Sequence, residues 1–85
     1  MIDLRADDAE AFRSRANAYV LKGEYAHAIQ DFSRLIGLRP DDDHAYWSRS
    51  LVYDKTHDDA AALADRNRSA EIAKTRAEAP KHTNR

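Results

Sequence analysis

The chain repeats its own residue pattern at an interval of 34 positions. Laid against itself at that offset, it brings identical residues together in these pairs: Asp8 with Asp42, Ala11 with Ala45, Ser14 with Ser48, Arg15 with Arg49, Tyr19 with Tyr53, Ala28 with Ala62, Asp31 with Asp65 and Arg34 with Arg68. A repeat of this length is typical of a supersecondary unit that buries its apolar face against the next copy. The sequence therefore predicts two copies of one folding unit.

Composition favours helices in both units. Of the 85 residues, 34% are charged, and only two are glycine and two are proline. Alanine is abundant and the β-branched richness of strands is missing, so we expect an all-α fold. The length suffices for one small domain, whose core offsets the entropy of folding only narrowly.

The same composition argues against several classes of function. Fourteen basic and fifteen acidic residues give a net charge of −1, and the interspersed signs predict no binding of nucleic acid or of an anionic membrane. Without cysteine, the chain has no disulfide, thiolate nucleophile or zinc–sulfur site. The first residues lack the apolar segment of a secretory signal, and no apolar run reaches the roughly 20 residues of a membrane span. We therefore expect a cytoplasmic protein.

Apolar spacing and helix breakers divide each unit into two helices. The spacing predicts helices over about 8–22, 24–38, 43–56 and 58–78. Gly23 separates the first two helices, because glycine readily adopts the left-handed geometry of a helix end, and Pro40 stops the second. We expect a lead-in over 1–7, the first unit over 8–41, the second over 42–79 with an extended capping helix, and a disordered tail over 80–85.

These landmarks resemble the tetratricopeptide repeat, a 34-residue helix–turn–helix unit. The matching structural positions are Phe12, Tyr19, Gly23, Ala28, Phe32 and Pro40 in the first unit, and Tyr46, Tyr53 and Ala62 in the second. The second unit departs further from the family pattern, since His57 replaces the turn glycine and Arg66 replaces an aromatic residue. The resemblance implies two stacked hairpins whose first helices line a concave groove that holds a peptide or a partner helix.

Arginine takes the place of an apolar family residue in both units, at Arg15 and Arg49. Asp31 and Asp65 recur one helix later in the same units. We predict an Arg15–Asp31 and an Arg49–Asp65 ion pair between the two helices of each hairpin. The alternative is unrelated surface charges. Such pairs fix geometry more than they add stability, because desolvation cancels most of the Coulomb gain.

The register of the resemblance places a set of side chains in the groove. They are Arg13, Asn17, Val20, His44, Trp47, Ser48, Leu51 and Asp54. Trp47 follows Tyr46, which takes the core position, so Trp47 should point into the groove and anchor a partner. The alternative is that Trp47 folds over its own unit. Arg13 and Asn17 also match two positions that grip a C-terminal carboxylate in some family members, but Ser48 replaces the next asparagine of that site.

Polar or small residues replace apolar ones in the last predicted helix. Arg66, Ser69 and Ala70 stand where the first unit has Phe32, Leu35 and Ile36. This exchange predicts a capping helix with a wettable outer face. Two units are nonetheless fewer than a self-sufficient stack needs, so we expect either a homodimer or reliance on a partner protein.

The sequence does not favour catalysis. Its histidines are scattered, its two glycines form no phosphate loop and its serines lack a nucleophile-elbow context. We expect no enzyme, no metal and no cofactor. Two functions remain: an adaptor that captures a peptide or helix of another protein in the groove, or a self-assembly module satisfied by another copy of itself.

Overall fold

All regular structure in the computed structural model, which describes residues 4–78, is α-helical. The helices are α1 (Leu4–Lys22), α2 (Tyr25–Leu38), α3 (Asp43–Lys55) and α4 (Asp59–Glu78). The predicted fold class is confirmed at this level, and the three later helices begin and end within a residue of their predicted bounds. The expected tail over 80–85 lies outside the described residues.

The predicted start of the first helix is wrong. α1 begins at Leu4, so residues 4–7 are helical rather than part of a lead-in. Asp7 and Asp8 are residues of a type that favours an N-cap, but no helix breaker precedes them and the residues between Leu4 and Asp7 are compatible with helix. The capping preference of aspartate is too weak to end a helix whose preceding residues can continue it.

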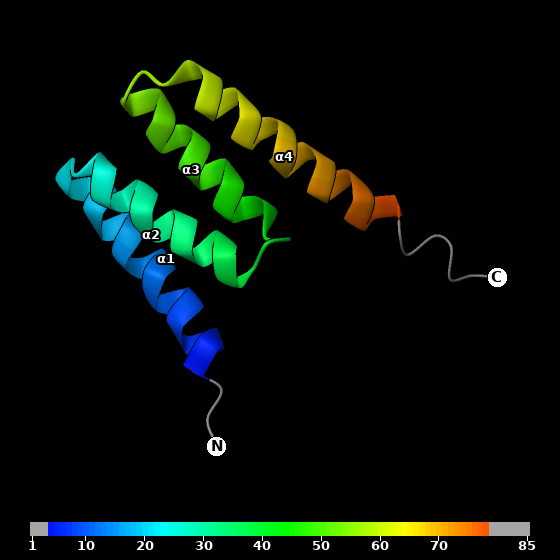
Figure 1. Cartoon of the computed structure of the whole chain (residues 1–85), viewed down its shortest axis with the longest axis horizontal. Helices are drawn as coiled ribbons and strands as arrows, with labels where there is room; N and C mark the ends of the chain where they lie inside the picture. Colours follow the sequence, from blue (N-terminus) through cyan, green and yellow to red (C-terminus); the bar gives the residue numbers. More distant parts are fainter. Residues whose placement is uncertain (1–3, 79–85) are drawn as a thin grey trace.

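The helices pack in chain order, α1 with α2, α2 with α3 and α3 with α4. In Figure 1 they follow one another across the molecule, with α1 and α4 at opposite ends of the row. A cluster of small and branched residues forms the core, namely Ala9, Ala16, Ala28, Phe32, Leu35, Ala45 and Val52. Alanines at these contacts let the helix axes approach closely, and Phe32 and Leu35 fill the space that remains.

The turn between α1 and α2 is a Schellman motif. Gly23 adopts a left-handed conformation with φ of 78°. Its amide donates to the Val20 carbonyl at 3.0 Å, and the Glu24 amide donates to the Tyr19 carbonyl at 2.9 Å. These two bonds satisfy carbonyls that the end of α1 would otherwise leave without a donor, as predicted for a glycine at this position.

The turn between α3 and α4 has the same hydrogen bonds without a glycine. His57 takes the left-handed position with φ of 62°. Its amide donates to the Asp54 carbonyl at 3.1 Å, and the Asp58 amide donates to the Tyr53 carbonyl at 2.9 Å. The 34-residue repeat therefore extends to individual hydrogen bonds, and His57 bears the steric cost that glycine avoids in the first turn.

Candidate protein-interaction groove

Each antiparallel helix pair contains one buried carboxylate held by an arginine of the preceding helix. In the first pair, Arg15 Nε donates to Asp31 Oδ2 at 2.7 Å and Arg15 Nη2 donates to Asp31 Oδ1 at 2.9 Å. The guanidinium carbon lies 5.8 Å from the centre of the Phe12 ring and 6.0 Å from that of Tyr19. Arg34 adds a third bond, from Nη1 to Asp31 Oδ1 at 3.0 Å. The predicted Arg15–Asp31 pair is present.

The second helix pair repeats this arrangement. Arg49 Nε and Nη2 each donate to Asp65 at 2.8 Å, and the guanidinium carbon lies 5.7 Å from the ring centres of Tyr46 and Tyr53. Arg49 has one further bond, from Nη1 to Ser33 Oγ at 2.9 Å. Because Ser33 belongs to α2, this bond joins the two helix pairs. The predicted Arg49–Asp65 pair is present as well.

Position in the row distinguishes the two arginines. The Arg15 side chain keeps 54% of its surface exposed, while that of Arg49 keeps 18%. The Arg15 hydrogen bonds lower the pKa of Asp31 below the ordinary aspartate value, although burial opposes this effect. The pKa of Arg49 is raised by its hydrogen bonds to Asp65. Arg49 therefore lies closer to the interior of the row than Arg15 does.

The aspartates of the α2–α3 connection tie this loop to both outer helices. Asp42 caps α3 by accepting from the Ala45 amide at 3.1 Å, and it also accepts from Arg13 of α1. Asp43 accepts from Arg76 of α4 at 2.7 Å, and this hydrogen bond lowers the pKa of Asp43. The sequence gives no sign of these arginine partners, because they lie 29 and 33 residues away along the chain.

A cavity of about 250 Å³ opens between α1 and α3. Its lining comes from both helices and from one α2 residue at the base, and comprises Asn17, Val20, Phe32, Ser48, Leu51, Val52 and Lys55. The walls are mainly apolar, with Asn17, Ser48 and Lys55 as the polar members. Four of the eight residues predicted for the groove lie here, namely Asn17, Val20, Ser48 and Leu51.

Trp47 does not line this cavity, contrary to the prediction. Its ring lies 5.7 Å from the guanidinium carbon of Arg66 in α4, and 48% of the residue is exposed. Arg66 also pairs with Asp54, another residue predicted for the groove. On helix α3, the side chains at 47 and 54 project towards α4 and the far end of the row, whereas those at 48, 52 and 55 face α1. Because Tyr46 takes the core position, the sequence indicated that Trp47 points away from the core. It did not indicate which of these two directions the Trp47 side chain takes.

The other two predicted groove residues also have specific positions. Arg13 is bound to Asp42 and lies 3.6 Å from Glu10, so its guanidinium already has two carboxylate partners. This is a departure from the carboxylate-gripping role that the resemblance suggested for Arg13. His44 is exposed in the first turn of α3. Aspartates stand at 41–43, directly before α3, where a carboxylate commonly caps a helix, so their presence does not by itself indicate a pairing with Arg13.

The capping prediction for α4 is only partly supported. Ser69 is buried and donates to the Asp43 carbonyl at 3.0 Å, so it belongs to the contact between α3 and α4 and not to an outer face. Arg66 pairs with Asp54 and lies over the ring of Trp47, both in α3. In addition, Leu63 is 58% exposed, so the outer side of α4 is not uniformly polar.

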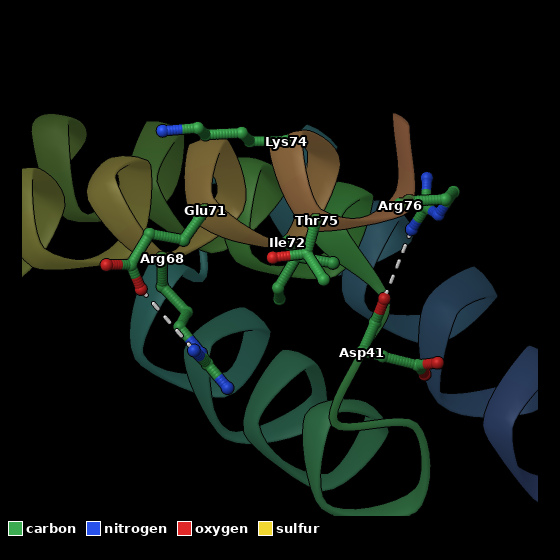
Figure 2. Close-up of a pocket in the computed structure, with 7 residues that line it drawn as sticks. All are labelled: Asp41, Arg68, Glu71, Ile72, Lys74, Thr75 and Arg76. Carbon is green, nitrogen blue, oxygen red and sulfur yellow. Dashed lines mark hydrogen bonds and ion pairs between the residues drawn. The ribbon is translucent and has the colours of Figure 1, made fainter. Parts of the chain in front are cut away.

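A second, wider hollow of about 710 Å³ lies below α4, on the side of the α2–α3 connection. Figure 2 shows Ile72 and Thr75 pointing into it from α4, while Arg68 reaches towards α2 and Arg76 is bonded to the Asp41 carbonyl. Lys74 runs along the upper side of α4, away from these groups. Its lining is mostly charged, with Arg68 lying 3.5 Å from Glu71 and Arg76 bonded to Asp43, so it is less suited to an apolar side chain than the cavity between α1 and α3.

Within residues 4–78, no group of three or more histidine or acidic side chains could hold a metal ion. No helix in this range is both long and apolar enough to cross a membrane. Comparisons with protein-family models, curated proteins and solved structures find no match to this chain.

Proposed function

We propose that the chain is a protein-interaction scaffold built from two stacked hairpins of the tetratricopeptide type, and that it binds a peptide or helix of another protein between α1 and α3. The single observation that carries the proposal is the cavity lined by Val20, Phe32 and Leu51. An apolar hollow of this kind between two exposed helices accepts one or two large side chains, and polar groups at its rim orient the backbone that carries them. The proposal requires no cofactor and no catalytic group.

Support for the repeat comes from equivalent interactions 34 residues apart. Both pairs share the bidentate arginine–aspartate contact, the aromatic rings beside the arginine and the Schellman turn. Such repetition favours one folding unit used twice over two unrelated hairpins. In that arrangement α1 and α3 are the leading helices of the units, and the surface between them is the groove.

The test is selection from a phage-displayed library of random peptides on the immobilised chain. Peptides that bind the wild type should lose binding to a Leu51→Arg variant, because the added cation occupies the apolar cavity. An Ala64→Arg variant is the matched control, since Ala64 is exposed on α4 and outside the cavity lining. If selected peptides bind Leu51→Arg as well as they bind the wild type, the groove is not the binding site.

A further inference from the structure

The contact between the two helix pairs shows how one pair covers the next. On the α2 side it uses Phe32, which is buried, and Ser33, whose hydroxyl accepts from Arg49. On the α3 side it uses Arg49 and the buried Val52. The same surfaces, shifted by 34 residues, lie at the two ends of the row: α4 presents the equivalents of the α2 surface, and α1 presents the equivalents of the α3 surface.

The α1 end retains an arginine with unused bonding capacity. Arg15 has aspartate and aromatic neighbours equivalent to those of Arg49, but among the side chains that the structure describes, residues 8–77, none accepts from its Nη1 group, the one that Arg49 directs at Ser33. At the α4 end, the residue 34 positions after Ser33 is Asn67, which is exposed. An asparagine side-chain oxygen accepts this type of hydrogen bond as a serine hydroxyl does.

Three exposed apolar side chains stand at positions whose equivalents one unit away in the chain have a neighbour. They are Leu21, Trp47 and Leu63, whereas Leu51 lines the cavity between α1 and α3. Leu63 repeats Ile29, which is partly buried and packs against the core. Trp47 repeats Arg13, whose partner Asp42 belongs to the next helix pair. Leu21, at 89% exposure, repeats Lys55, which lines the cavity between α1 and α3. Each of these residues would therefore meet a neighbour if the row continued.

Polar or small residues replace the large apolar residues of the inner contact at both ends of the row. Inside the chain, Phe32 packs beside Leu51 and Val52. Shifted by one unit, these three positions become Arg66 on α4, and Asn17 and Ala18 on α1. In a contact equivalent to the inner one, the short side chains of Asn17 and Ala18 would leave room for Arg66, which keeps its contacts with Asp54 and Trp47.

We propose that copies of this chain associate head to tail, with the outer surface of α4 in one copy packed on the outer surface of α1 in the next. The contact reproduces the one between α2 and α3, with Asn67 accepting from Arg15 Nη1 of the neighbouring copy. It is a heterologous interface, because two different surfaces meet, so each added copy leaves a free end for another. This self-association does not depend on peptide binding in the groove.

Sedimentation velocity with two variants tests the proposal. Ala18→Arg blocks the α1 end and Leu63→Arg blocks the α4 end. Both sites are exposed and arginine is a good helix former, so circular dichroism should show wild-type helix content for both. The average sedimentation coefficient of the wild type should rise from micromolar to millimolar concentration, while each variant alone stays monomeric. Ala64→Arg, one residue from Leu63 but about 100° around the helix, should associate like the wild type.

The decisive sample is an equimolar mixture of the two blocked variants. Each retains one intact end, so the mixture should form dimers and nothing larger. A wild type that stays monomeric at millimolar concentration would overturn the proposal. So would a mixture that contains only monomers. If Ala18→Arg alone still dimerises, the contact joins two α4 surfaces and the head-to-tail arrangement is wrong.

Discussion

Replacing Arg49 by methionine should destabilise the fold far more than the same replacement of Arg15. Both arginines bind an aspartate through two hydrogen bonds and lie between two aromatic rings. Methionine keeps an unbranched apolar stem, although a shorter one, and lacks the guanidinium. The comparison therefore asks what the same ion pair contributes at the inner and at the outer position of the row.

The expected difference in stability depends on the hydrogen bonds that each aspartate retains after its arginine is replaced. Without Arg15, the Asp31 carboxylate still accepts from Arg34 at 3.0 Å. Without Arg49, Asp65 is left as a buried carboxylate with no other described partner, because Arg49 makes both of its ion-pair bonds. Stranding a buried charge costs about 3–5 kcal/mol. A chain of 85 residues has a free energy of unfolding of about 4–13 kcal/mol, so Arg49→Met should remove a large part of it.

Urea unfolding followed by circular dichroism measures both variants. With a slope of about 1 kcal/mol per molar urea, Arg49→Met should lower the midpoint by about 3 M or leave the chain unfolded in buffer. Arg15→Met should stay folded with a clearly smaller loss. A double variant, Arg49→Met with Asp65→Leu, should recover most of the stability because neither charge remains. Equal losses for the two single variants, or no recovery in the double variant, would refute this reasoning.

Three further sets of substitutions test the turns, the α2–α3 connection and the response to acid. His57→Gly should stabilise the chain by about 0.5–1 kcal/mol, because glycine removes the left-handed strain but adds freedom to the unfolded chain, and thermal unfolding should show a higher midpoint. Gly23→Ala should do the reverse, although nothing lies within 4 Å of the added methyl group. Asp42→Ala should cost about 1–2 kcal/mol in urea unfolding by removing the α3 cap, while Asp42→Asn keeps the cap and should cost less. Because the pKa values of Asp31 and Asp43 are lowered, their stabilisation is present above the ordinary aspartate pKa of 3.8 and is lost as the pH falls through the lowered values. The urea concentration at the unfolding midpoint should therefore decrease when the pH is lowered below about 4. This decrease should be less steep for Asp43→Asn than for the wild type.

Local rules were sufficient to predict much of this fold. The repeat, the helix breakers and the apolar spacing gave four helices and most of their ends, because these signals act within a few residues of where they occur. The Arg15–Asp31 pair was also accessible, since the repeat showed the same two residue types at the same separation twice. The missed start of α1 reflects a cap signal that was present but too weak to decide the boundary.

Groove residues were harder to predict, because a helix has several exposed directions and the register of a family places a residue only approximately. Asn17, Val20, Ser48 and Leu51 fell on the cavity, but Trp47 turned towards α4. Its direction depends on a cation 19 positions later in the chain, and nothing near Trp47 announces that contact. The Arg13–Asp42 contact likewise depends on how the second helix pair is placed on the first.

The bidentate contact has a consequence for the relative position of the paired helices. A slip by one helical turn would move a side chain by about 5.4 Å, which is more than either hydrogen bond from Arg49 to Asp65 could span. Apolar packing tolerates such shifts more easily, since one alanine surface resembles the next. The arginine and aspartate therefore fix the register of the two helices. They exclude shifted packings that the alanine-rich contacts alone would permit.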